Sequence, residues 1–248
     1  MIDIEEAKRF VEALPDIEEG RCYLLMLMAR SRYVQEYMGI KAKDIVLERA
    51  IIPWSETWRD SLLRKIVKLD TLKSNAEKVY LIDGVPVDSR ALTIMIVINS
   101  SRVKHALIDF MGETLRKVVL EEDWYRIAKL HTLWFGMLHK RAKGRLHRID
   151  LDIKDTDTMN FLEDELDKYG GWWMKLETKR GYHYIIDTSR IDPRRFFGEF
   201  KQKVFPELRK KLMTPDGIPL LDYSKNPLEP IPGTTYGEFM VKIIDIRE

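Results

Sequence analysis

Several features that would fix a class of protein are missing from this sequence. Cysteine occurs once, at Cys22, so the chain can form neither an internal disulfide nor a cysteine-rich zinc site, and no zinc site is expected. No apolar run approaches the roughly 20 residues of a membrane span, so no membrane partner is expected. The lone cysteine and the acidic start of the chain predict a cytoplasmic location.

An excess of charge of either sign is also missing. The 42 lysines and arginines nearly balance the 40 aspartates and glutamates, which leaves a net charge of +2. Since no overall field attracts nucleic acid, any basic site must be local. With 248 residues and 45% hydrophobic content, the chain can bury one large core or two small ones.

Apolar residues at helical spacing dominate the first part of the chain. They predict helices over 4–14, 18–38 and 56–69, in which the apolar run 22–29 is short enough to be a buried helix. We therefore divide the chain into a helical N-terminal region, 1–75, and a catalytic core, 76–248. The core is expected to begin with strands over 78–83 and 91–99 and helices over 102–117 and 122–141.

The last hundred residues, 146–248, show a more regular order. Turn and cap residues separate the predicted strands and helices, which follow one another as strand 147–153, helix 158–168, strands 172–178 and 182–187, a helix opened by Asp192-Pro193, and strand 218–223. This β-α-β-β-α-β order is that of the ferredoxin-like unit shared by RNA-recognition (RRM) modules and polymerase palms. The fold class expected is α/β (α+β), with an RRM-like unit after the helical part.

The hypothesis about function starts from the predicted strand 147–153, which carries two acidic residues. Alternation along the strand places Ile149 and Leu151 on one face and Asp150 and Asp152 on the other. Two carboxylates about 6–7 Å apart along a strand can share a pair of divalent cations. The simpler alternative is that this face of the strand is solvated.

Two further polar residues are expected on the same face, because the first strand of this topology lies between the third and the fourth. They are His183 on the third strand and Asp222 on the fourth. The turn before His183 offers hydroxyl, ammonium, guanidinium and backbone N–H groups to phosphate oxygens, from Thr178, Lys179, Arg180 and Gly181. A structural histidine and an exposed acid that closes its strand are the alternatives.

Taken in order, these motifs resemble those of the archaeo-eukaryotic primase superfamily. The family-like features are the acid pair at Asp150 and Asp152, the Gly-x-His motif at His183, and the hydrophobic-Asp motif at Asp222. The continuation 222–226, Asp-Tyr-Ser-Lys-Asn, is similar to the polymerase domain of bacterial end-joining ligases. The resemblance covers roughly the second half of the chain together with the strand near 91–99.

The resemblance implies a two-ion site and a nucleotide site. Three acids, Asp150, Asp152 and Asp222, would be catalytic and hold two Mg²⁺ or Mn²⁺ ions. His183 would contact the triphosphate of the incoming nucleotide. The remaining phosphate contacts would come from Thr178, Lys179, Arg180 and Lys225.

The activity implied is that of a DNA or RNA primase-polymerase, a template-dependent nucleotidyltransferase that extends nucleic acid from nucleoside triphosphates in replication or repair. Its expected partners are a single-stranded template, a primer-template and a helicase or other replication or repair protein. One alternative is a non-catalytic, RRM-like nucleic-acid-binding accessory protein. Another is a metal-dependent glycosyltransferase, which also uses Asp-x-Asp but requires a parallel, Rossmann-like sheet.

Overall fold

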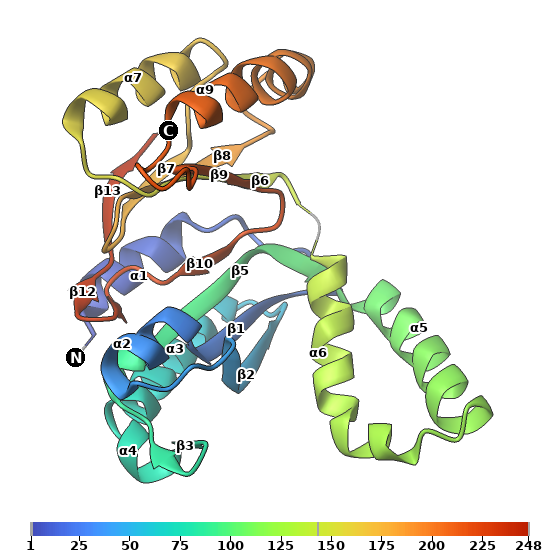
Figure 1. Ribbon diagram of the computed structural model, residues 1–248. Coiled ribbons are helices and arrows are strands. Elements are labelled where there is room, and N and C mark those ends of the chain that lie inside the picture. Colours follow the sequence, from blue (N-terminus) through green and yellow to red (C-terminus); the bar gives the residue numbers. More distant parts are fainter. Residues whose placement is uncertain (1, 143, 248) are drawn as a thin grey trace.

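Two larger antiparallel sheets organise the chain, which the computed structural model describes over residues 2–142 and 144–247 (Figure 1). The fold is mixed α/β, as expected. The first sheet has the strand order β10 (Leu228–Pro230), β5 (Leu92–Arg102), β1 (Arg21–Ala29) and β2 (Ile45–Pro53). Two of these four strands come from residues 1–75, so the description of that region as helical is wrong.

The helix predicted over 18–38 is replaced by a strand and a short helix. β1 occupies the apolar run, and α2 (Ser31–Met38) follows it. Both faces of β1 are covered: Leu25 lies in the larger core, while Leu24 lies in a smaller core beneath a helical hairpin. A run buried on both sides shows no strand-like alternation, and for this reason its periodicity does not separate strand from helix.

Other parts of residues 1–91 agree better with the helical prediction. α1 (Ile4–Ala13) and α3 (Trp58–Ser74) lie where helices were expected. The strand predicted over 78–83 is largely replaced by a helical turn and a two-residue strand. The small elements are α4 (Ala76–Val79), β3 (Leu81–Ile82), β4 (Val85–Pro86) and η1 (Ser89–Ala91), with β11 (Thr235–Tyr236) and β12 (Phe239–Met240) near the C-terminus.

The second sheet confirms the predicted β-α-β-β-α-β order. Its strand order is β13 (Lys242–Ile246), β7 (Met174–Glu177), β8 (Tyr182–Asp187), β6 (Leu146–Leu151) and β9 (Leu221–Ser224). The first strand of the unit, β6, therefore lies between the third and fourth, β8 and β9. Every pair in this sheet is antiparallel, which removes the parallel sheet that a glycosyltransferase would need.

Helices cover the outer face of this sheet (Figure 1). They are α7 (Thr156–Asp167) and the continuous helical segment α8 (Pro193–Arg195), η4 (Phe196–Val204) and α9 (Phe205–Lys211). Ile149, Leu151 and Tyr184 are buried beneath these helices. The predicted division of β6 into an apolar face and an acidic face is therefore confirmed.

The inner face of the second sheet packs on the rest of the molecule. Leu146, Leu176 and Ile185 share the largest buried core with Leu25 and Ile96 of the first sheet. About 25 cal/mol is gained for each square ångström of apolar surface that such a core removes from water, so contacts across this core stabilise both sheets. The sheet face that a free RRM module would offer to RNA is thus largely occupied by protein.

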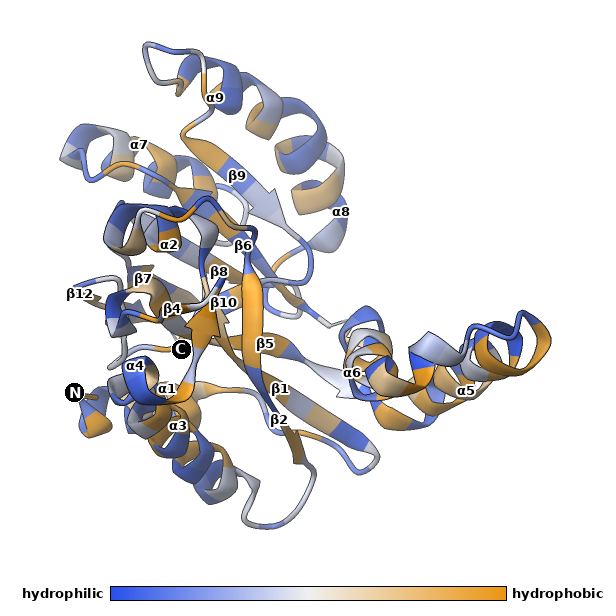
Figure 2. Cartoon of the chain, turned by 60° about the horizontal axis from the view of Figure 1, so that its bottom comes forward, coloured by the Kyte–Doolittle hydropathy of each residue, from blue (hydrophilic) through white to orange (hydrophobic). Residues whose placement is uncertain are grey.

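A helical hairpin projects from the end of β5 (Figures 1 and 2). It consists of α5 (Val103–Thr114), the π-helical η2 (Leu115–Leu120), the 3₁₀-helical η3 (Trp124–Lys129) and α6 (Leu130–Arg141). Phe110 packs on Trp134, and Arg141 pairs with Asp109, which holds the two arms together. In the described parts of the chain, no helix is both long and apolar enough to span a bilayer.

Candidate functional site

A polar pocket of about 370 Å³ lies where β10 of the first sheet meets β6 and β8 of the second. Its charged lining comes from the second sheet and from the chain that leaves β1, and consists of Arg30, Arg32, Arg148, Asp150, Asp152 and His183. Three of these residues were predicted to share a site, namely Asp150, Asp152 and His183. The three arginines were not.

The strand register explains why the predicted residues converge. Asp150 lies opposite His183 on one neighbouring strand and opposite Asp222 on the other. Leu221, next to Asp222, is buried under the helices, so Asp222 belongs to the same sheet face as Asp150. Its side chain, however, is 68% exposed and approaches Arg209, with 3.9 Å between Oδ1 and Nη2. Asp222 therefore borders the pocket and does not line it.

His183 is held between two carboxylates. Its Nδ1 is 2.5 Å from Oε2 of Glu229, and its Nε2 is 3.3 Å from Oδ1 of Asp150. Burial by itself lowers the pKa of His183, but the negative charges of Asp150 and Glu229 outweigh burial and raise that pKa to about 9. The side chain is therefore an imidazolium at neutral pH, and both ring nitrogens carry protons.

Glu229 is the residue that sequence reasoning missed most completely. It is fully buried on β10, where it faces His183 and also pairs with Arg148, whose Nη1 lies 3.0 Å from its Oε1. Asp150 contacts the same two cations, with 3.6 Å between its Oδ2 and Nη2 of Arg148, so Glu229 and Asp150 together compensate Arg148 and His183. Arg148 could have been predicted from the sequence, because alternation along β6 places it on the same face as Asp150.

Asp150 on β6 and Asp152 just beyond its end are held in different electrostatic surroundings. Burial tends to raise the pKa of Asp150, but His183 and Arg148 lower it to about 2. The pKa of Asp152 is raised, first by burial and then by the charge of Asp150. Asp150 is thus ionised at neutral pH. The negative charge of Asp150 disfavours the ionised form of Asp152, which a nearby cation would stabilise.

Buried polar atoms without a hydrogen-bond partner are concentrated around this pocket. Eleven such side-chain atoms occur among the described residues, and six belong to residues that line it. Buried polar atoms are normally paired, so a cluster of unpaired ones indicates a ligand or ordered solvent. Two of the six still take part in ion pairs, since Nε of Arg30 lies 3.1 Å from Oδ2 of Asp44 and Oδ1 of Asp150 lies 3.3 Å from Nε2 of His183. The other four are Nε of Arg32, Nε of Arg148, Nε2 of His139 and Oδ1 of Asn226.

The chemistry of these residues fits a divalent cation in part. Asp150 and Asp152 both line the pocket, and carboxylates are preferred ligands of Mg²⁺ and Mn²⁺. Within residues 2–142 and 144–247, no three His, Cys, Asp or Glu side chains are already grouped as metal ligands. Asp222 would have to turn from Arg209 toward Asp150 to complete a set of three.

The remaining predicted phosphate contacts are dispersed. Thr178 is buried at the pocket wall. Lys179 points to α2 and pairs with Glu36 at 2.8 Å. Arg180 is exposed, and its charge lowers the pKa of Asp152. Lys225 is also exposed, and its charge lowers the pKa of His147. The ring of His147 packs against Phe197 on the helix-covered side. The structure thus brings Thr178 to the site and leaves Lys179 and Lys225 outside it.

Gly181 is required by a close approach of two backbone segments. A Cβ atom at this position would lie only 2.7 Å from the backbone N of Ile153 and still closer to the carbonyl oxygen of Leu151. Gly181→Ala is therefore expected to push the Thr178 turn away from the end of β6 and to destabilise the fold by about 1–3 kcal/mol. Urea unfolding measures this loss, and Gly198→Ala, where nothing lies within 4 Å, is the control. Equal stability of the two variants would contradict the packing described.

Comparison with known proteins gives this site no precedent. The chain matches no protein-family model, no curated protein and no solved structure. The function must therefore be argued from the geometry and charges of the pocket.

Proposed function

We propose that the protein is a template-dependent nucleotidyltransferase of the primase-polymerase type, which extends a nucleic-acid strand from nucleoside triphosphates with two Mg²⁺ or Mn²⁺ ions. The observation that carries the proposal is the cluster of buried polar atoms without a hydrogen-bond partner around an acidic strand, four of which are free of ion pairs as well. Two of those four atoms belong to Arg32 and Arg148, and arginines bind phosphate; the carboxylates of Asp150 and Asp152, which line the same pocket, bind cations. A metal-bound triphosphate offers both partners at once.

Each side chain has a distinct role in this proposal. Arg30, Arg32 and Arg148 donate to the triphosphate oxygens, because guanidinium groups match the geometry of phosphate. The imidazolium of His183 adds a further positive charge beside them. Asp150 and Asp152 hold the cations, and Asp222 joins them after its side chain turns inward. When bound, the divalent cations neutralise charge on the attacking and departing oxygens.

The alternative of a non-catalytic RRM-like module is less well supported. Such a module binds RNA on the open face of its sheet through aromatic side chains. Here Tyr184 lies under the helices with its hydroxyl bonded to Glu163, and the opposite face of the sheet packs into the main core. Nucleic-acid binding at the polar pocket itself would still be compatible with such an accessory protein.

Primer extension separates the two functions. A labelled primer on a single-stranded template is incubated with ribo- or deoxyribonucleotides in Mn²⁺, in Mg²⁺ or in excess chelator. We expect extension products that require the metal, and omission of the primer then tests for priming. Failure to extend with every nucleotide, combined with nucleic-acid binding that is indifferent to chelator, would overturn the proposal in favour of the accessory protein.

A further inference from the structure

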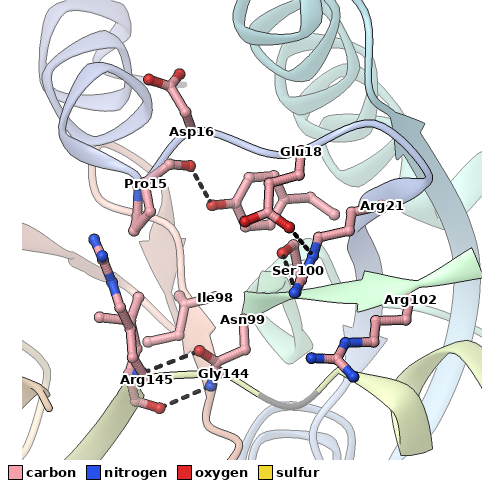
Figure 3. Close-up of a pocket in the computed structure, with 12 residues that line it drawn as sticks. Pro15, Asp16, Glu18, Arg21, Ile98, Asn99, Ser100, Arg102, Gly144 and Arg145 are labelled. Carbon is pink, nitrogen blue, oxygen red and sulfur yellow. Dashed lines mark hydrogen bonds and ion pairs between the residues drawn. The ribbon is translucent and has the colours of Figure 1, made fainter. Parts of the chain in front are cut away.

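A second hollow lies at the base of the helical hairpin, where β1, β5 and the start of β6 come together (Figure 3). Its volume is about 630 Å³, larger than that of the pocket around Asp150. Three arginines from separate segments line it: Arg21 begins β1, Arg102 ends β5, and Arg145 precedes β6. None of them belongs to the polymerase motifs or to the pocket described above.

One of the three arginines of this hollow has no ion-pair partner among the described residues, and the other two have one. Arg21 pairs with Glu18 at 3.0 Å and also contacts Ser100. Arg145 is half exposed and lies 3.3 Å from the buried Asp187, which Arg190 also approaches, at 3.6 Å. Arg102 is exposed and makes no side-chain hydrogen bond or ion pair with any described residue.

The acids near the hollow do not cancel its positive charge. Asp16 is already bound by Arg59, and Glu18 by Arg21. Arg102 and Arg145 stand on opposite sides of the hollow, with Gly144 and Asn99 between them (Figure 3). Two guanidinium groups that face a common space, with a hydroxyl at Ser100 nearby, provide the donors that phosphate oxygens accept.

The frame around these arginines is rigid. The side chain of Asn99 is buried and bridges to β6, donating to the carbonyl of Leu146 at 2.7 Å and accepting from its N–H at 3.1 Å. Gly144 lies so close to Asn99 that an added Cβ would be 2.6 Å from its Cγ. The backbone beside Arg145 is therefore fixed relative to β5, which holds the main-chain positions of Arg102 and Arg145 on the two sides of the hollow.

We propose that this hollow binds backbone phosphates of the nucleic-acid strand on which the pocket around Asp150 acts. This inference rests on the proposed function. Leu146, in the hollow, precedes Asp150 by four residues of one strand, or about 13 Å at 3.3 Å per residue. That distance equals about four steps of a stacked strand, so a short oligonucleotide is long enough to reach from one place to the other. Phosphate contacts of this kind position a strand without reading its sequence.

The test measures binding in chelator, where no polymerisation can occur. Fluorescence anisotropy of a labelled single-stranded oligonucleotide is followed against salt concentration for the wild type, Arg102→Gln and Arg102→Gln/Arg145→Gln. We expect the double variant to bind about tenfold more weakly, since charge-assisted hydrogen bonds are lost. Its slope of log Kd against log salt should fall by about 1.4, or about 0.7 for each lost phosphate contact.

Controls separate this inference from loss of the fold and from failure of the proposed function. Arg194→Gln removes another exposed arginine without a described side-chain partner, and should change neither quantity. Arg102→Gln breaks no described contact, so its binding defect is not a folding defect; circular dichroism checks this.

Unchanged affinity and slope in both hollow variants would overturn the inference. Loss of ATP binding with oligonucleotide binding retained would also overturn it, by assigning the hollow to a free nucleotide. Strand binding through Arg102 without primer extension would contradict only the proposed function.

Discussion

Asp152→Asn is expected to lower the rate of primer extension by at least about 100-fold while leaving the protein as stable as the wild type. The loss follows from removing a carboxylate that neutralises and positions the reacting phosphates through a cation. Stability should be retained because Asp152 sits beside Asp150 and its pKa is raised, so its charge is a cost to the native state. Its backbone N–H bond to Leu220, at 2.8 Å, does not depend on the side chain.

The measurement compares initial rates of extension at equal enzyme concentration, with thermal unfolding as the check on the fold. Asp157→Asn is a matched control, because Asp157 is an exposed acid a few residues further along the chain. It should extend primers at the wild-type rate. Undiminished extension by a folded Asp152→Asn protein would refute the catalytic assignment.

Glu229→Gln is expected to produce the largest change in stability, about 3–5 kcal/mol at neutral pH. The amide can still accept a hydrogen bond, but it removes the fully buried member of the two carboxylates that compensate Arg148 and His183, and leaves only Asp150 beside them. Chemical unfolding measures the loss. Glu238→Gln changes an exposed glutamate that pairs with Arg90 at the surface, and should cost at most about 1 kcal/mol.

The same substitution has a pH signature with a definite sign. Because the folded pKa of His183, about 9, exceeds its ordinary value of 6.5, its imidazolium stabilises the fold fully below pH 6.5, and this contribution is lost as pH rises through 9. Removing the charge of Glu229 lowers the pKa of His183, so the loss should begin at lower pH. NMR titration of the imidazole measures both values. An unchanged pKa in Glu229→Gln would contradict the pairing.

The sequence predicted the acidic strand correctly because β6 is buried on one side by helices and polar on the other. In such a strand the alternation of apolar and polar residues predicts which side chains are buried. Ile149 therefore lies on the helix-covered face, and Asp150 lies on the opposite face. The order of elements then placed His183 and Asp222 on the neighbouring strands. Topology and a half-buried strand were sufficient for this much of the site.

Arg30, Arg32 and Glu229 could not be predicted because they come from segments outside the second sheet. Arg30 and Arg32 follow β1, whose two covered faces made it resemble a helix. Glu229 lies in a proline-rich segment that pairs with β5, and that pairing has no local sequence signal. Lys179 was expected at the phosphates because of its charge, but Glu36 on α2 offers a closer partner. Contacts between distant segments decided each of these positions.

Binding of Mn²⁺ tests whether the acids of this pocket serve phosphoryl transfer, without requiring the correct nucleic-acid substrate. Electron paramagnetic resonance counts the Mn²⁺ bound in the presence of a nucleoside triphosphate, for the wild type and for Asp150→Asn/Asp152→Asn. We expect saturable binding that the triphosphate strengthens and that the double variant loses. Equal Mn²⁺ binding by the folded variant, or none by the wild type with any triphosphate, would refute the assignment of these acids.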